Sequence, residues 1–170
     1  MKSKGNIVFL GMMGSGKTTV GKLVSRKLKQ EFFDTDHEIE NKFKMKIKEI
    51  FSKKGETFFR NYEEKLTLEI LKKKNVVISL GGGTFLNKYV QKEILSNHLS
   101  FWLNWDDKIL IERIKGSSKR PIAFKASKNE LSNLIKKRSN IYSKALYKLN
   151  CESFTKDDIV KNIVDIYEAN

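Results

Sequence analysis

Cysteine, proline and long hydrophobic runs are nearly absent from this sequence. Cys151 is the only cysteine among 170 residues, so no internal disulfide can form, and a lone thiol suits a reducing compartment. No apolar run approaches the ~20 residues that a membrane-spanning helix needs. The apolar stretch near the N-terminus is broken by glycines and lacks a convincing signal-peptide cleavage site. These absences predict a cytoplasmic protein without a membrane partner.

Arginine and histidine are scarce as well. Only five of the 34 basic residues are arginine. Where lysine is the usual cation, an arginine is notable because its planar guanidinium binds anions through two parallel hydrogen bonds; chance placement is the alternative. The two histidines lack metal-ligand spacing, so neither receives a role. The arginines are Arg26, Arg60, Arg113, Arg120 and Arg138.

The formal net charge of +14 has two interpretations. One is a surface that binds nucleic acid, and the other is a lysine-rich solvated surface on a protein that handles anions. The lysines recur along almost every predicted helix without one dominating tail, and no zinc-finger, homeodomain or RNA-recognition pattern accompanies them. We favour the solvated surface and expect no nucleic-acid partner.

Strand and helix patterns alternate along the chain, which predicts an α/β fold with a largely parallel sheet. No repeat, linker or second-domain boundary interrupts them, so we expect one domain over residues 1–170. Residues 116–126 contain the only proline, Pro121, and predict a loop that serves as a lid. We expect strands at 5–10, 31–36, 75–83, 100–105 and 148–154, and helices at 17–29, 37–53, 56–73, 106–115, 128–147 and 156–168.

A phosphate-binding loop is the strongest signal. Residues 11–18, GMMGSGKT, match G-x-x-x-x-G-K-[ST] between a predicted strand and a predicted helix. The glycines let backbone N–H groups converge on phosphate oxygens at the helix start. Lys17 would reach the β- and γ-phosphates, and the Thr18 hydroxyl would bind Mg²⁺. A glycine-rich turn with a chance lysine is the weaker alternative.

Two acidic residues follow the second predicted strand. In an extended chain the side chains of Asp34 and Asp36 point to the same side. One carboxylate could hold Mg²⁺ through water, and the other could accept the proton of a substrate hydroxyl. A helix-capping pair is an equally good interpretation, because Asp36 precedes a predicted helix.

Four further features could bind an anion or a ligand. Glu63 lies one helical turn from Arg60 and could orient its guanidinium, although a solvated ion pair is the usual outcome. Gly81, Gly82 and Gly83 follow a buried strand and would expose backbone N–H groups where open α/β sheets bind ligands. Arg120 in the predicted lid could stabilise a transferring phosphoryl group, and Arg138 could pair with a substrate anion. Surface placement is the alternative for both arginines.

Together these motifs resemble the shikimate kinase family. The matching segments, in order, are GMMGSGKT, the DTD of 34–36, the GETFFR of 55–60 with Glu63, the LGGG of 80–83, RP at 120–121 and KRSNIY at 137–142. Many NTPases share the phosphate-binding loop, but the ordered combination is specific. The resemblance implies ATP-dependent phosphorylation of the 3-hydroxyl of shikimate, giving shikimate 3-phosphate and ADP in the pathway to chorismate and aromatic amino acids.

The resemblance also implies a fold and a nucleotide site. The fold would be a three-layer α/β/α P-loop kinase with a five-stranded parallel sheet, a substrate-binding helical region at about 34–62 and a lid at about 115–126. Asp34 would support Mg²⁺ beside Thr18. Lys17 and Arg120 would act on the transferring phosphoryl group. The nucleotide would contact Gly14, Ser15, Gly16, Lys17, Thr18, Thr19, Arg113 and Arg120, with Arg113 against the adenine.

For the acceptor, the resemblance makes Asp36 the ligand of the shikimate hydroxyls and the candidate catalytic base. Arg60 and Arg138 would grip the carboxylate, and the Gly82 backbone would contact the ring. The complete expected acceptor set is Asp36, Phe51, Phe59, Arg60, Glu63, Gly81, Gly82, Gly83 and Arg138, with the two phenylalanines as an aromatic wall.

Residues 150–156 depart from the family pattern because they lack the proline often found on the adenine side. Three other functions compete with shikimate phosphorylation. A nucleoside monophosphate kinase would need more cations for its acceptor's phosphate, and gluconate kinase is a second small P-loop enzyme with a hydroxy-acid acceptor. A basic nucleotide-regulated protein that binds nucleic acid is the rival from another class. We expect a monomer.

Overall fold

The computed structural model describes residues 5–115 and 126–170. Its strands are β1 (Ile7–Leu10), β2 (Glu31–Asp34), β3 (Val76–Ser79), β4 (Leu99–Asn104) and β5 (Tyr147–Asn150). The helices are α1 (Lys17–Leu28), α2 (Thr35–Phe43), α3 (Ile47–Lys54), α4 (Glu56–Leu71), α5 (Lys88–Asn97), α6 (Asp107–Lys115), α8 (Lys128–Tyr142) and α9 (Lys156–Ala169). Short 3₁₀ turns lie at η1 (Thr84–Leu86) and η2 (Cys151–Ser153).

The five strands form one parallel sheet in the order β2-β3-β1-β4-β5. β2 and β3 end together at the paired residues Asp34 and Ser79, and β1 ends one residue further, at Leu10. β4 and β5 continue for two residues beyond the pair of Leu10 with Trp102. β1 is central, and the chain turns to opposite sides of it to form β3 and β4, which is the switch point where open α/β sheets bind ligands. The predicted α/β fold with a five-stranded parallel sheet is confirmed.

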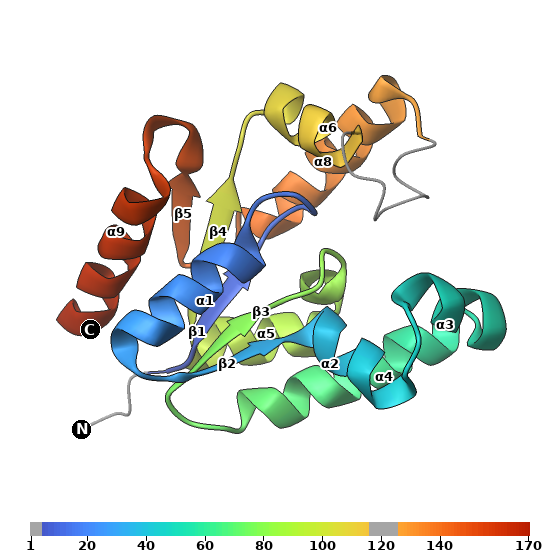
Figure 1. Ribbon diagram of the computed structural model, residues 1–170, viewed down its shortest axis with the longest axis horizontal. Helices are drawn as coiled ribbons and strands as arrows, with labels where there is room; N and C mark the ends of the chain where they lie inside the picture. The colour runs from blue at the N-terminus through green and yellow to red at the C-terminus, as the bar shows by residue number, and fades with distance from the viewer. Residues whose placement is uncertain (1–4, 116–125) are drawn as a thin grey trace.

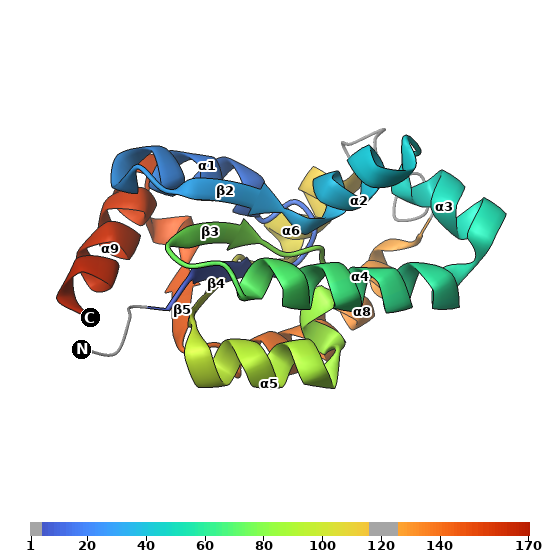
Figure 2. The same ribbon diagram turned by 90° about the horizontal axis from the view of Figure 1, so that it is seen from below.

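Helices cover both faces of the sheet, which explains why its strands are continuously apolar. Successive side chains of β1 point to opposite faces. Val8 and Leu10 pack with residues of α4, α5 and α8, whereas Ile7 and Phe9 pack with residues of α1 and α9. Figure 2 shows α1 and α5 on opposite faces of the sheet.

A smaller apolar cluster joins α2, α3 and α4 beyond the carboxyl ends of β2 and β3. It consists of Ile39, Ile50 and Phe59, all buried. Figure 1 shows α2 and α3 on one side of the open sheet edge and α6 and α8 on the other. The carboxyl end of β1 therefore lies between α2 and α3 on one side and α6 and α8 on the other.

The segment after β2 differs from the sequence-based prediction. We expected an extended chain through Asp36 and one helix over 37–53. Instead Asp34 ends the strand and caps α2, its Oδ1 accepting a hydrogen bond from the His37 N–H at 3.2 Å. Lys44, in the left-handed region at φ 53°, then ends α2 before α3 begins. The prediction that Asp34 and Asp36 lie in one extended segment with their side chains on the same side was wrong, because Asp36 lies in the first turn of α2.

One unpredicted helix and several element boundaries also differ from the prediction. Helix α5 was not predicted, although Asn87 caps it by accepting hydrogen bonds from Tyr89 and Val90 N–H groups. Helix α8 ends at Tyr142 rather than 147, and β5 begins at Tyr147. Residues 116–125 of the predicted lid, including Arg120, lie outside the described residues. Among the residues described, no helix is both long and apolar enough to cross a membrane.

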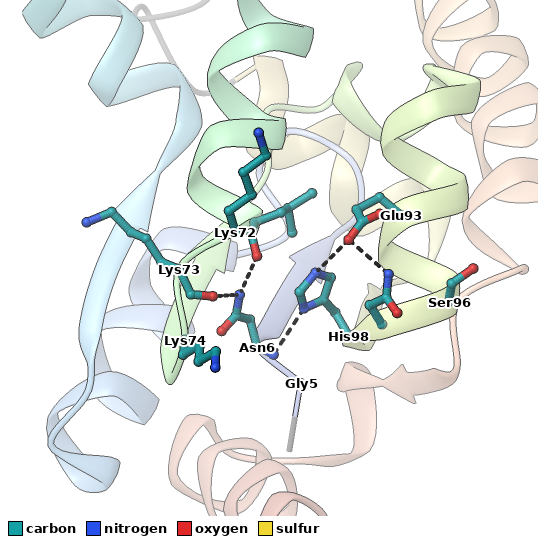
Figure 3. A pocket seen from close by; sticks show the side chains of 10 residues that line it. Gly5, Asn6, Lys72, Lys73, Lys74, Glu93, Ser96 and His98 are labelled. Carbon is teal, nitrogen blue, oxygen red and sulfur yellow. Dashed lines mark hydrogen bonds and ion pairs between the residues drawn. The ribbon is translucent and has the colours of Figure 1, made fainter. Parts of the chain in front are cut away.

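A hollow of about 450 Å³ lies at the opposite, amino ends of β1, β3 and β4 (Figure 3). Asn6 Nδ2 donates to the carbonyls of Leu71 and Lys73 at 3.1 and 2.8 Å, and the Asn6 N–H donates to His98 Nδ1 at 3.1 Å. His98 Nε2 faces Glu93 at 3.7 Å, and burial lowers the pKa of His98. Asn6 thus ties the end of α4 to β1, whereas His98 Nε2 is buried without a hydrogen-bond partner among the described residues.

Candidate active site

The loop after β1 depends on glycine at three positions. Gly11, Gly14 and Gly16 have φ values of 139°, 82° and 90°, where a side chain is strained. The Ser15 N–H donates to the Met12 carbonyl at 3.2 Å and closes the turn. Gly16 is the N-cap of α1 and brings the positive end of that helix to the loop. The backbone therefore has the geometry of a phosphate cradle.

Lys17 is buried inside this loop. Its Nζ donates to the carbonyls of Gly11 and Met12 at 2.8 and 2.9 Å. These bonds hold the ammonium group across the loop, at the carboxyl end of the central strand. The lysine is therefore placed beside any phosphate that the cradle holds.

Thr18 and Asp34 lie together at the start of α1 and the end of β2. The Thr18 hydroxyl donates to Asp34 Oδ2 at 2.6 Å. Over residues 5–115 and 126–170, no group of three or more His, Cys, Asp or Glu side chains could hold a metal ion. One hydroxyl and one carboxylate nevertheless fit Mg²⁺, which keeps several waters and takes most other ligands from nucleotide phosphates.

Arg113 reaches the same loop from α6. Its Nη1 donates to the Gly14 carbonyl at 3.3 Å, and its guanidinium carbon lies 3.9 Å from the centre of the Trp105 ring. Trp105 Nε1–H donates to the Ser15 carbonyl at 2.9 Å. The residue expected beside adenine is thus next to the loop.

Each of the three consecutive glycines after β3 faces a different side chain of the expected acceptor set. A β-carbon at Gly81 would collide with Asp36 Oδ1. One at Gly82 would lie 3.3 Å from Arg138 Nη1, and one at Gly83 would lie 2.8 Å from Arg60 Nη1. No glycine of this run has a positive φ. These positions therefore need glycine for space rather than for backbone conformation.

The prediction that the glycine run offers free N–H groups is wrong for Gly81. Its N–H donates to the buried Thr35 hydroxyl at 2.8 Å. The Gly82 carbonyl accepts a hydrogen bond from the Tyr142 hydroxyl. The run is fixed from both sides, by α2 and by α8.

Arg60 is held by a buried carboxylate. Its Nη1 donates to Glu63 Oε2 at 2.7 Å, and Glu63 Oε1 accepts from the Thr84 hydroxyl at 2.7 Å. The guanidinium carbon lies 5.7 and 5.2 Å from the ring centres of Phe51 and Phe59. Phe51 is partly exposed, whereas Phe59 is only 2% exposed and belongs to the apolar cluster of α2, α3 and α4. Of the two residues expected to form an aromatic wall, Phe59 is therefore a buried support for Arg60, and only Phe51 is open to a substrate.

Arg138 projects from α8 toward Gly82. Its Nε is buried and has no hydrogen-bond partner among the residues the structure describes. A buried guanidinium N–H without an acceptor is costly, and an anionic ligand would supply that acceptor. The unpaired N–H of Arg138 therefore indicates that the site binds a negatively charged group.

The pKa of the Asp36 carboxyl group is unusually high. Burial, followed by the charges of Asp34 and Glu63, raises its pKa to about 6, while Lys17 opposes the shift. A carboxylate with a pKa close to neutrality is a better proton acceptor than one with the ordinary value. Asp36 therefore suits a base at a site that handles a hydroxyl group.

Four side chains that hold these groups in place were not predicted from the sequence. They are Thr35, Thr84, Trp105 and Tyr142. Each acts through one hydrogen bond across a long stretch of chain, which no local pattern reveals. The buried thiol of Cys151 is not among the functional groups, because burial raises its pKa to about 11.

The phosphate cradle at the end of β1, the parallel sheet and the acceptor groups facing the cradle define a P-loop kinase. The sequence model described as shikimate kinase matches residues 13–168. A shikimate kinase of Thermodesulfovibrio yellowstonii is 38% identical over 164 residues, which cover 96% of this chain and 95% of that protein. The chain belongs to the shikimate kinase family.

Solved structures agree with this membership. The shikimate kinase of Acinetobacter baumannii in complex with shikimate superposes with a TM-score of 0.89 at 29% identity, covering 99% of this chain and 96% of that one. The Aquifex aeolicus shikimate kinase has a TM-score of 0.86 at 37% identity, with 97% of each chain covered. The predicted family and P-loop kinase fold are confirmed.

Proposed function

We propose that the protein transfers the γ-phosphoryl group of ATP to the 3-hydroxyl of shikimate, giving shikimate 3-phosphate and ADP. The observation that carries this is the convergence of Asp36, Arg60 and Arg138 on the glycine run beside the phosphate-binding loop. Shikimate is a small polyol carboxylate, so its site needs an acceptor for hydroxyls and cations for the carboxylate. This trio supplies both.

One set of residues acts on ATP, the phosphoryl donor, and another acts on shikimate, the phosphoryl acceptor. The hydroxyl oxygen bonds to the γ-phosphorus as the bond to the β,γ-bridging oxygen breaks, and Asp36 accepts the hydroxyl proton. Lys17 and the loop N–H groups stabilise charge on the phosphoryl oxygens. Arg60 and Arg138 hold the carboxylate at the far end of the substrate. Because the transition state is loose, orientation of the hydroxyl by Asp36 is as important as proton removal.

Mg²⁺ would be held by the Thr18 hydroxyl and, through water, by Asp34, and it would neutralise charge on the phosphates. The short bond between these two side chains supports this assignment. We further propose one monomeric cytoplasmic kinase domain whose acceptor region is 34–62 and which has no nucleic-acid or membrane partner. The dispersed lysines and the single buried cysteine support that view.

A coupled assay of ADP release tests the function, with shikimate, gluconate and AMP offered separately. We expect rapid turnover with shikimate alone. Within the described residues, Arg60 and Arg138 are the arginines that lie against the glycine run, and both are assigned to the shikimate carboxylate, so we expect no turnover with AMP. No turnover with shikimate would overturn the proposal. Salt-sensitive binding to nonspecific DNA without turnover of any small acid would favour the nucleic-acid alternative.

Arg60→Lys should raise the KM for shikimate about 10- to 100-fold with a smaller change in the KM for ATP. An ammonium cannot reproduce the guanidinium fork that contacts Glu63 while presenting further donors to a carboxylate. Steady-state kinetics with each substrate varied in turn measures both constants. Arg26→Lys is the matched control, because Arg26 lies in the last turn of α1 and is exposed. A change confined to the KM for ATP would contradict the role of Arg60 in binding shikimate.

A further inference from the structure

Trp105 joins the end of the sheet to the phosphate-binding loop. It follows the last residue of β4, and its indole N–H donates to the Ser15 carbonyl at 2.9 Å across 90 positions of sequence. Its ring is partly buried and packs against the apolar residues on both faces of the sheet. A rigid side chain thus fixes one carbonyl of the loop to the core.

The bond to Ser15 orients a neighbouring donor. In a trans peptide the C=O and N–H point in opposite directions. A Ser15 carbonyl that points outward to Trp105 therefore turns the Gly16 N–H toward the inside of the loop. Gly16 has no side chain, and a β-carbon there would meet nothing within 4 Å. The orientation of this peptide therefore depends on its hydrogen bonds.

Trp105 also orders Arg113. Arg113 is exposed on α6, where a long side chain would otherwise sample many rotamers. The guanidinium lies on the indole face at 3.9 Å and donates to the Gly14 carbonyl at 3.3 Å. Stacking covers one face of the flat cation and leaves the opposite face for a planar ligand group. Two successive loop carbonyls are thus held by two side chains that stack on each other.

We propose that Trp105 is a positioning residue of the nucleotide site, which orients the Gly16 N–H toward the phosphates and Arg113 toward the base. The inference rests on the proposed function only in taking an adenine nucleotide as the ligand. It predicts that Trp105 acts on nucleotide affinity and leaves the acceptor site unchanged, since Asp36, Arg60 and Arg138 lie against the glycine run after β3 and not against Trp105.

Two variants separate the two contacts of Trp105. Trp105→Phe keeps an aromatic face under Arg113 but removes the N–H donor, and ADP binding should weaken about 3- to 10-fold, the usual worth of one hydrogen bond. Trp105→Leu removes both contacts and should weaken ADP binding about 10- to 50-fold. Isothermal titration calorimetry of the full chain with ADP gives these affinities, and the KM for shikimate should stay within about twofold.

Trp102→Phe is the matched control. Trp102 lies three residues earlier on β4 and is 5% exposed. Its ring lies beside Gly11 and packs near Tyr142, but among the described residues its indole N–H donates no hydrogen bond to the loop. This variant should bind ADP as the wild type does. With Trp105 its only tryptophan, its fluorescence should respond to ADP, whereas the fluorescence of Trp105→Phe should not.

Two results would overturn the proposal. One is wild-type affinity for ADP in Trp105→Leu, or in Trp105→Phe if the leucine variant does not fold. The other is an equal loss of ADP affinity in Trp102→Phe, which would mean that general destabilisation is responsible. ADP binding is measured without shikimate, so a protein that needs Trp105 for ADP but does not phosphorylate shikimate would reject only the proposed function.

Discussion

Asp36→Asn should lower kcat by about 10³-fold or more and should also make the folded protein more stable. The loss of turnover follows from removal of the proton acceptor, whose usual worth is 10²–10⁴-fold. Asparagine has nearly the same shape, so the acceptor pocket keeps its walls. ADP affinity should be almost unchanged, because the hydrogen bonds that join Lys17 and Trp105 to the loop do not involve Asp36.

The gain in stability follows from the raised pKa of Asp36. The carboxyl has a pKa of about 6 in the folded protein and 3.8 in the unfolded chain. Above pH 6 both states are ionised, and the folded state bears the full cost of a charge that is partly desolvated and close to Asp34 and Glu63. Two pKa units correspond to about 3 kcal/mol, and solvent screening of this partly exposed side chain reduces the expected gain to about 1–2 kcal/mol.

The pH dependence has a definite sign. Between pH 3.8 and 6 the folded state binds a proton that the unfolded state has released, so the wild type becomes less stable as the pH rises through this window. The advantage of Asp36→Asn should therefore be largest above pH 7 and disappear near pH 4. Urea unfolding at several pH values measures it.

Glu38→Gln serves as the control for Asp36→Asn, since it removes a carboxylate from the same helix two positions away. In the wild type, kcat/KM for shikimate should fall as the pH drops below about 6, when Asp36 gains its proton. An Asp36→Asn variant that keeps most of its turnover, or that loses ADP affinity, would contradict the acceptor role.

Sequence patterns were sufficient where function and structure are local. The loop motif, its strand and its helix occupy adjacent positions, and the structure has them as predicted. Helix α5 was missed because only two of its residues, Val90 and Ile94, are buried. These two lie on one face after the Asn87 cap, which was a readable signal. The position of Asp36 was misjudged because Asp34, not Asp36, is the residue that caps the helix.

The reason why glycine is required at positions 81–83 could not be derived from the sequence. Three glycines after a strand predicted a backbone that binds ligands, and their φ values give no support for a special turn. Their purpose is visible only when α2, α4 and α8 bring Asp36, Arg60 and Arg138 to them. The side chains that occupy the space come from about a hundred residues of chain, so packing rather than pattern explains the motif.

Gly81→Ala and Gly83→Ala should damage the acceptor site in two different ways. At Gly83 the new methyl group would lie 2.8–3.2 Å from the guanidinium atoms of Arg60. A long, partly exposed side chain moves aside at little cost in stability, so the expected effect is a rise of 10-fold or more in the KM for shikimate. At Gly81 the methyl group would meet Asp36 Oδ1, and Thr84 Oγ1 at 2.9 Å. These groups are short and enclosed, so we expect a fall in kcat and a loss of about 1–3 kcal/mol in stability.

Gly82→Ala is the internal control for this series, because its methyl group would lie 3.3 Å from Arg138 Nη1 and 3.7 Å from the Met13 N. None of the three positions has a positive φ, so alanine adds volume without backbone strain at each. The effect on shikimate kinetics should therefore be smallest at Gly82, and ADP affinity should be unchanged throughout. Equal damage at all three positions would show that the run needs glycine flexibility, and the one-to-one match between glycines and acceptor side chains would then be wrong.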